Sequence, residues 1–382
     1  MGAVGRRTVL DHIQCSYAND DSFEWFGGSV NAKHLIAIGG LDDDFDTDNG
    51  FSGKVQFGIG QRYRTVADVS TSQAFESDND ANSSFNQPLT SAVFSNVTAI
   101  GPLQDTSWTT GSGANQYSSR FGAGAQIRRN SRQSIHNTLF LGWPRGLEIA
   151  QLPTMVAANG DSLEVRNCSW YGVKGATMTL AGLNSGQVAP PGFDNTWISK
   201  PAFNNIIEKS SPSFAMVEAP FITNVDFNPA LKTGSPALTG AAFAGTASDP
   251  FFERVEYRGA VGMERWDLEW TEYDPVNRAY KAQDPTSVNE EMFTTVAIAG
   301  RVFPNPTQDA STVRYELAYD DVVSVRVTNA IGALSTSFLV NARQNAGTYE
   351  FRLVTADLAS GIYYLTITGQ RGTITLPVTV AH

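Results

Sequence analysis

Five of the seven residues from Asp42 to Asp48 are aspartates, in the stretch GLDDDFDTDNGFSG (40–53). Carboxylates this close together repel one another at neutral pH, so water, a cation or a ligand must make the run tolerable. The segment DFDTDNG (44–50) spaces its oxygens two residues apart, as calcium-binding loops do, and Ca²⁺ takes about six to eight oxygen ligands. It is not an EF-hand, because its glycine falls one place late and no glutamate closes the loop.

More acidic residues recur in a shared pattern, an apolar residue followed by an acid: FEW (23–25), FDT (45–47), FES (75–77) and LEI (147–149). On a strand, alternation would turn the apolar side chains inward and the acids outward. Stacked on successive coils, the acids would form a ladder of carboxylates. We therefore expect a Ca²⁺ site on an acidic face, with the ligands drawn from Glu24, Asp42, Asp44, Asp46, Asp48, Glu76 and Asp78.

Two other interpretations of the acidic residues stay open. They could form a solvated surface, because aspartate favours turns and aids solubility. They could also be catalytic, since paired carboxylates hydrolyse glycosides and a calcium-bound uronate beside a basic residue supports β-elimination. Lys33, Lys54, Arg62 and Arg64 lie in the acidic segment and could supply that base. No nucleophile, zinc-protease or phosphate-loop motif is present, so we assign no catalytic residue and favour a non-enzymatic function.

An internal repeat indicates how these residues are positioned. HIQCSYANDDSFEWFGG (12–28) aligns with HLIAIGGLDDDFDTDNG (34–50) at a constant offset of 22, so that His12 meets His34 and Glu24 meets Asp46. Similar short runs begin at His34, Val55 and, with asparagine, at 96, 137 and 167. They are rich in β-branched or aromatic residues and end in glycine. The stretches between them show no helical period of 3.6 residues. The pattern predicts a right-handed parallel β-helix over residues 1–185, with coils about 4.8 Å apart. The three asparagines are expected to stack in a turn ladder.

The second half of the chain has a different character. Residues 186–275 are rich in proline, glycine and large aromatics, and we expect them to cap the β-helix and cover its side. Residues 276–300 are predicted to be a linker. From residue 301 to 382, short strands alternate with turn residues, which is typical of a small immunoglobulin-like β-sandwich. The expected fold class is therefore all-β throughout.

Composition limits the partners and the compartment. The net charge is −11, and the segment Cys15–Asp80 alone contributes −8, with twelve acids against four bases. Such acidity excludes nucleic acid as a partner. The two cysteines, Cys15 and Cys168, form no disulfide framework or zinc site. No apolar run reaches the roughly 20 residues of a membrane helix, and the start MGAVGRRTVLDHIQ lacks a signal-peptide core, which indicates either a cytosolic chain or a mature or truncated form.

The last 80 residues resemble a known family. FPNP (303–306), TNAIGA (328–333), GTYEFRL (347–353) and LASGIYYLTI (358–367) look like the C-terminal sorting domain of type IX secretion cargo in the Bacteroidota. The first domain resembles the β-helix proteins that often precede such sorting domains. The sorting motif maps onto Pro304, Asn305, Pro306, Gly361 and Tyr363.

This resemblance implies export through the type IX secretion machinery to the cell surface or the extracellular space. We expect a surface scaffold for adhesion, matrix or filament formation, with self-association through the ends of the β-helix or binding of a polysaccharide. The alternatives are a polysaccharide lyase or glycoside hydrolase acting on the acidic face, and a glycan-binding module without catalysis.

Overall fold

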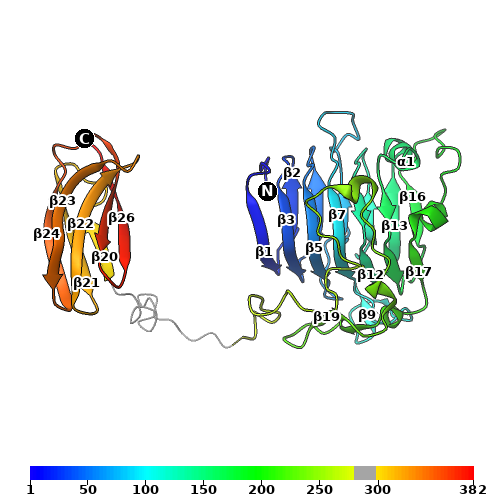
Figure 1. Ribbon diagram of the computed structural model, residues 1–382. Helices are drawn as coiled ribbons and strands as arrows, with labels where there is room; N and C mark the ends of the chain where they lie inside the picture. Colours follow the sequence, from blue (N-terminus) through cyan, green and yellow to red (C-terminus); the bar gives the residue numbers. More distant parts are fainter. Residues whose placement is uncertain (279–297) are drawn as a thin grey trace. The chain divides into compact units, whose positions relative to one another are not determined.

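The computed structural model describes residues 1–278 and 298–382, which belong to two separate compact units (Figure 1). The first unit contains two parallel sheets whose strands alternate along the chain. The longer sheet runs through β1 (Val9–Ser16), β3 (Asn31–Ile38), β5 (Lys54–Gln61), β7 (Val93–Ile100), β12 (Leu139–Leu141), β15 (Ser169–Tyr171) and β17 (Ile206–Glu208), with β11 (Ser134–His136) and β14 (Val165–Arg166) beside them.

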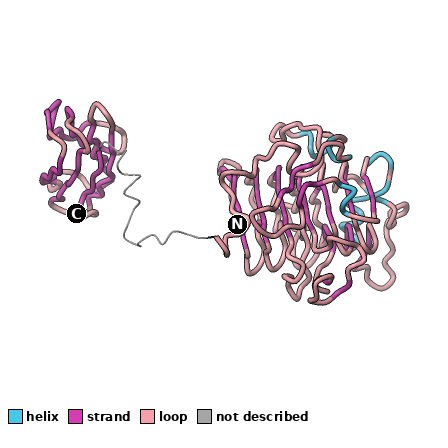
Figure 2. Tube along the Cα trace, turned by 90° about the horizontal axis from the view of Figure 1, so that it is seen from below, coloured by secondary structure: helices cyan, strands magenta, loops and turns pink. Residues whose placement is uncertain are grey.

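The second sheet contains β2 (Phe23–Phe26), β4 (Phe45–Asp48), β6 (Phe75–Ser77), β10 (Ala123–Ile127), β13 (Arg145–Ala150) and β16 (Met178–Ala181). Each turn of the chain therefore adds one strand to each sheet, and Figure 2 shows the coils stacked along one direction. This is the predicted parallel β-helix. A pair of short strands, β8 (Thr109–Thr110) and β9 (Gln116–Tyr117), and one helix, α1 (Leu152–Asn159), lie in the turns between strands of the described part.

The register confirms the repeat at an offset of 22, because Val9 pairs with Asn31 and Phe23 with Phe45. The third run is shifted from the expected alignment: Leu35 pairs with Gly58, so Phe57 rather than Val55 is the equivalent of His34. This equivalence follows the backbone, which has one left-handed residue within each of β1, β3, β5 and β7, and one between β11 and β12 and between β14 and β15. That column consists of His12, His34, Phe57, Asn96, Asn137 and Asn167, with φ between 50° and 61°.

Asparagine tolerates the left-handed conformation better than most residues, which explains its recurrence in this column. The asparagine amides of this column were expected to hydrogen-bond to one another, but their main interactions are with the outer layer. Asn96 Nδ2 donates to the carbonyl of Tyr257, and Asn137 Nδ2 donates to that of Ala242. The amides in these two coils thus hold the outer layer onto the β-helix.

The interior of the coils is filled by apolar side chains on inward positions. Phe23, Phe45 and Phe75 occupy equivalent positions on three successive coils, and their ring centroids lie 5.8 and 5.6 Å apart. All three rings are buried. Burying such rings is worth about 2–3 kcal/mol each, so this stack helps fix which residues of neighbouring coils pair.

Residues beyond 185 complete the β-helix in two ways. Trp197 and Phe203, from the short 3₁₀ helices Trp197–Ser199 and Pro201–Phe203, close one end of the core. The following segment covers the outer face of the longer sheet, where Ile59 and Leu139 pack with Phe227 and other aromatics. It contains β18 (Val217–Ala219), β19 (Asn228–Leu231) and the 3₁₀ helices Pro212–Ala215, Pro236–Leu238 and Gly245–Ser248. The boundary expected at residue 185 precedes the last parallel strand, β17.

The second unit is a small antiparallel β-sandwich. One sheet contains β20 (Ile298–Phe303), β21 (Ala310–Leu317) and β24 (Gly347–Val354); the other contains β22 (Asp321–Asn329), β23 (Leu334–Gln344), β25 (Gly361–Thr368) and β26 (Thr373–Val380). Of the linker expected over 276–300, residues 276–278 belong to the first unit, 298–300 begin β20, and 279–297 lie outside the described residues.

Candidate functional site

The acidic ladder predicted from the sequence lies on the outer face of the second sheet. Glu24 pairs with Asp46, Asp46 with Glu76, and Glu76 with Gln126, which in turn pairs with Glu148. Successive coils thus place polar side chains one strand spacing apart. The glutamine interrupts what would otherwise be a continuous row of like charges. It donates through Nε2 to Glu148.

Three carboxylates converge at one end of the ladder. Asp21, in the turn before β2, joins Glu24 and Asp46, and one oxygen of each lies within 4.8 Å of the other two. Asp46 Oδ1 is buried and has no hydrogen-bond partner. Among residues 1–278, no lysine or arginine forms an ion pair with any of the three. We call Asp21, Glu24 and Asp46 the acidic triad.

Burial and mutual repulsion raise the pKa values of all three carboxyl groups of the acidic triad. Burial, reinforced by Glu76, Asp21 and Glu24, raises the pKa of Asp46 to about 9. Burial and neighbouring acids raise the pKa of Asp21 to about 7, and they also raise the pKa of Glu24. A cation among the three oxygens would favour their ionised forms and remove this cost.

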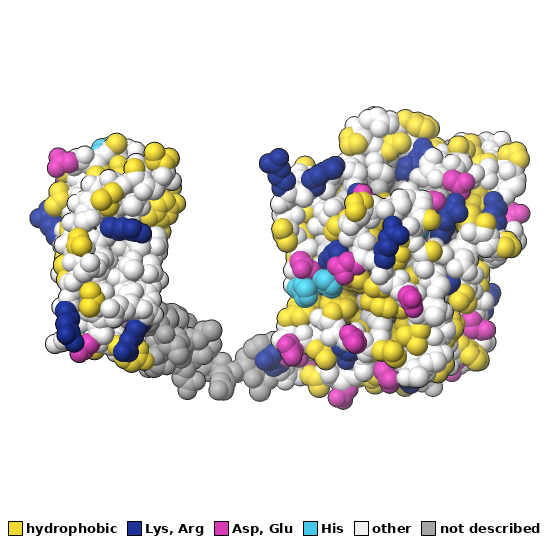
Figure 3. All heavy atoms as spheres, in the orientation of Figure 1, with side chains coloured by type: hydrophobic (Ala, Val, Ile, Leu, Met, Phe, Trp, Pro, Cys, Tyr) yellow, Lys and Arg dark blue, Asp and Glu magenta, His cyan; other side chains and the backbone are white. Residues whose placement is uncertain are grey.

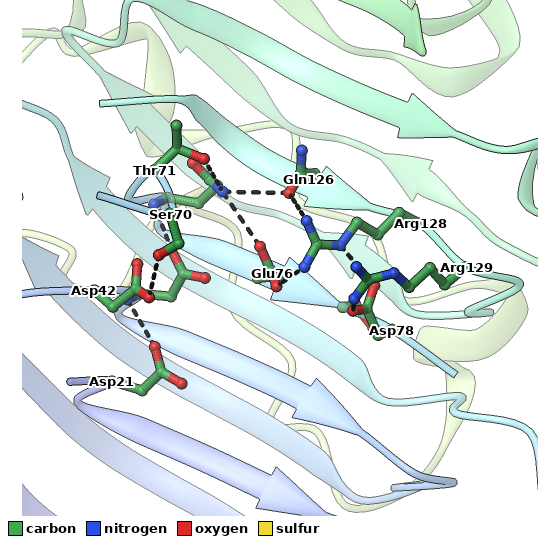
Figure 4. Close-up of polar contacts among 12 residues, drawn as sticks. Asp21, Asp42, Ser70, Thr71, Glu76, Asp78, Gln126, Arg128 and Arg129 are labelled. Carbon is green, nitrogen blue, oxygen red and sulfur yellow. Dashed lines mark hydrogen bonds and ion pairs between the residues drawn. The ribbon is translucent and has the colours of Figure 1, made fainter. Parts of the chain in front are cut away.

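Asp42 borders the acidic triad. One of its carboxylate oxygens, together with those of Asp20 and Asp21, belongs to a second group within 4.8 Å. Its Oδ2 accepts a hydrogen bond from Ser70 Oγ at 2.9 Å, whereas its Oδ1 is buried without a partner (Figure 4). Burial raises the pKa of Asp42 as well. The structure therefore brings Glu24, Asp42 and Asp46 of the predicted ligands into one neighbourhood.

Arginines occupy the next part of the face. Arg128 Nε donates to Asp78 at 2.8 Å, and the same guanidinium contacts Glu76 and the side-chain oxygen of Gln126. Arg129 also pairs with Asp78 (Figure 4). Burial still raises the pKa of Glu76 to about 7, although Arg128 opposes it. Glu76 and Asp78, both predicted as metal ligands, are thus engaged by arginines.

Two other predicted ligands lie apart from the acidic triad. Asp44 is fully buried on the inner side and pairs with Arg62 at 2.9 Å, where both side chains are inaccessible to solvent. Strand alternation would place Asp44 on the outward face with Asp46, but Asp44 precedes β4, so the alternation does not extend to it. Asp48 lies at the other end of β4, where it accepts a hydrogen bond from the N–H of Asn49.

Three residues of the site were not among the predicted ligands. Asp21 was visible in the repeat as the equivalent of Asp43, but its convergence with the ladder depends on the turn before β2. Gln126, in the segment AQI (125–127), follows the same apolar–polar–apolar pattern as FES and could have been found by it. Arg128, two residues later, would then have been placed beside Asp78.

The residues of the sorting motif tie together the edges of the β-sandwich. Asn305 Nδ2 donates to the carbonyl of Pro377, and its Oδ1 accepts from the N–H of Thr379, both at 2.8 Å. The carbonyl of Pro304 accepts from Ser311 Oγ. Pro306 completes the turn that leads to the bridge of the next residue with β26. Gly361 begins β25, and the buried Tyr363 donates its hydroxyl to the carbonyl of Ala359.

Comparison with known protein families gives one match for each of the two units. Residues 1–190 match the family described as pectate-lyase-like β-helix domain, and residues 301–380 match the secretion system C-terminal sorting domain. No curated protein matches the chain significantly. Across the described residues, every helix is too short or too polar to cross a membrane.

Proposed function

The chain is a cargo protein of the type IX secretion system with a parallel β-helix domain, exported to the cell surface or beyond, and from this premise we propose that it is an extracellular scaffold whose acidic face binds calcium. The observation that supports this proposal is the acidic triad. Its three carboxylate oxygens lie within 4.8 Å of one another, and no basic side chain of residues 1–278 neutralises them.

The residues suit a hard cation. Asp21, Glu24 and Asp46 would hold Ca²⁺ through carboxylate oxygens, and Asp42 adds negative charge beside them, because it groups with Asp20 and Asp21. Water would supply the remaining ligands, since Ca²⁺ accepts flexible shells of about six to eight oxygens. The ion would cross-link the coils that carry β2 and β4, because Glu24 and Asp46 lie on different coils. Such a cross-link stabilises a scaffold in calcium-rich surroundings.

Calcium titration of the full chain by isothermal calorimetry, after removal of metal with EDTA, tests this proposal. We expect Asp46→Asn and Glu24→Gln each to weaken the main binding event about tenfold or more, since ligand charge sets calcium affinity. Asp105→Asn is the matched control, because Asp105 is an exposed loop aspartate that caps Ser107. Equal binding by wild type and Asp46→Asn would reject the acidic triad as the calcium site.

The second candidate function is a polysaccharide lyase or glycoside hydrolase. The observation in its favour is that the pKa of Asp46 is raised to about 9 and that of Glu76 to about 7, so that a carboxyl group can carry a proton near neutral pH, as a general acid requires. Arg128 would be a poor base, because Glu76, Asp78 and Gln126 already accept its hydrogen bonds. A screen of acidic and neutral polysaccharides for unsaturated products or new reducing ends distinguishes an enzyme from a scaffold.

A glycan-binding module without turnover is the third candidate. A pocket of about 430 Å³ lies between the turn after β5, the loop containing Trp108 and the outer layer. Tyr63, Trp108 and Phe221 supply aromatic surface, and Arg64 and Asn115 supply polar groups, a combination that suits sugar rings. Binding on a glycan array without product formation, lost in Trp108→Ala, would favour this function over the enzyme.

A further inference from the structure

Two histidines and one aspartate form a compact cluster on the longer sheet, away from the acidic triad. His12 and His34 lie on adjacent coils, with ring centroids 4.3 Å apart. The Nδ1 atoms of both rings face the same oxygen of Asp11, at 3.1 Å for His12 and 2.6 Å for His34. All three donor atoms lie within 4.8 Å of one another.

The histidines occupy a position where other coils carry asparagine. Both belong to the left-handed column, with φ of 53° and 52°, as do Asn96 and Asn137. The two asparagines use their amides to hold backbone carbonyls of the outer layer. The two histidines instead direct their Nδ1 atoms to Asp11. Asparagine would therefore satisfy the backbone at positions 12 and 34, and the imidazoles add a convergent donor set that the backbone does not require.

Surrounding side chains fix both rings. Trp270 lies edge-on to His12 at 5.1 Å and Trp266 edge-on to His34 at 4.8 Å, while Phe57 stacks on His34 at 5.3 Å. These aromatic contacts limit rotation of the imidazoles and so reduce the entropy lost when they bind a ligand. Preorganised donors of this kind are the usual requirement for a tight site.

The cluster is open on one side. The side chains of His12 and Asp11 are 42% and 43% exposed, whereas that of His34 is 17% exposed. Figure 3 shows histidine side chains beside acidic ones on the visible surface of the β-helix unit. Lys33, the register partner of Asp11, pairs with Glu253 of the outer layer and leaves Asp11 to the histidines. An ion can therefore enter from solvent and keep water ligands.

We propose that Asp11, His12 and His34 bind a divalent transition-metal ion of the zinc class. Two imidazole nitrogens and one carboxylate oxygen are donors that Zn²⁺ accepts, with water in the remaining position. Each Nδ1 atom would bind the ion through its lone pair, so it carries no proton in the bound state. This donor set differs from the all-oxygen acidic triad, which suits calcium. The ion would join the coils of β1 and β3 through His12 and His34.

Zinc titration of the EDTA-treated full chain tests the site. We expect one equivalent to bind, and His12→Asn, His34→Asn or Asp11→Asn to weaken binding about tenfold to a hundredfold. Asparagine is the least disruptive replacement for the two histidines, because Asn96 and Asn137 occupy the same left-handed position on other coils. His382→Gln is the control, since His382 is an exposed histidine of the other unit.

Two further readouts separate a metal site from a hydrogen-bonded cluster. Co²⁺ in the same donors should give a visible absorption band that the double variant His12→Asn/His34→Asn lacks. Zinc should raise the melting midpoint of the wild type but not that of the double variant, and tryptophan fluorescence follows this unit alone because all seven tryptophans precede residue 279. One-equivalent zinc binding of unchanged affinity in the double variant would overturn the proposal, as would no binding by the wild type.

Discussion

Glu24 and Asp46 are direct partners in the parallel register of β2 and β4, so two acids stand on the same outer face of adjacent coils. Like-charged pairs across strands are destabilising. In the folded chain the carboxylates of the acidic triad therefore repel one another, and a bound cation or bound protons would relieve this repulsion.

Without metal, the β-helix should lose stability as pH rises. The pKa of Asp46 is raised from 3.8 to about 9, so between these values the folded chain holds a proton that the unfolded chain has released. The free energy of unfolding should thus be highest at mildly acidic pH and fall towards pH 9. Tryptophan-fluorescence melts in EDTA at pH values between about 5.5 and about 8.5 measure this dependence.

Asp46→Asn is the control for that dependence, because asparagine copies the protonated side chain. The variant should be more stable than wild type at about pH 8.5, by about 1 kcal/mol or more, and its melting midpoint should vary less with pH. A wild-type midpoint that rises with pH in EDTA would contradict the raised pKa of the acidic triad.

The buried ion pair of Asp44 and Arg62 should be intolerant of single changes. Arg62→Met leaves Asp44 buried without its partner and should lower the free energy of unfolding by about 3–5 kcal/mol. The double variant Asp44→Asn/Arg62→Met should recover part of the loss, because no buried charge remains. Urea unfolding followed by tryptophan fluorescence measures both, with the exposed Arg120→Met as control. Equal stability of Arg62→Met and wild type would show that the pair is not needed.

The stacked phenylalanines should stabilise the coils far more than their exposed neighbour does. Phe45→Ala removes a fully buried ring between Phe23 and Phe75 and should cost about 3–5 kcal/mol. Phe26→Ala, on β2, removes a ring that is 42% exposed and should cost about 1 kcal/mol or less. The same urea experiment compares them, and similar losses for the two variants would contradict the packing described for the core.

Removal of the sorting domain should prevent export. A chain ending at residue 297 should stay on the periplasmic side of the outer membrane, because the sorting domain engages the type IX secretion machinery. Asn305→Ala should weaken the sorting domain by about 1–3 kcal/mol, since it removes two hydrogen bonds to β26. Cell fractionation with protease accessibility measures export. Surface exposure of the truncated chain at the wild-type level would refute this assignment.

The amino-acid sequence by itself determined the repeat, the strand alternation and the sorting domain. Glu24, Asp46 and Glu76 could be placed in one row because each follows an inward phenylalanine, a local pattern that fixes which face a side chain takes. The strands of the β-sandwich could also be predicted from local sequence, because turn residues mark their ends.

Only the tertiary structure decided which acids remain free. Asp44 meets Arg62 inside the coil, and Asp78 meets Arg128 from a later coil, because the path of each turn rather than the strand pattern brings them together. The same holds for His12 and Trp270, which are more than two hundred residues apart in the chain but touch where the outer layer folds back over the longer sheet. Periodicity specifies the face of a strand, whereas contacts between turns and layers depend on how the whole chain packs.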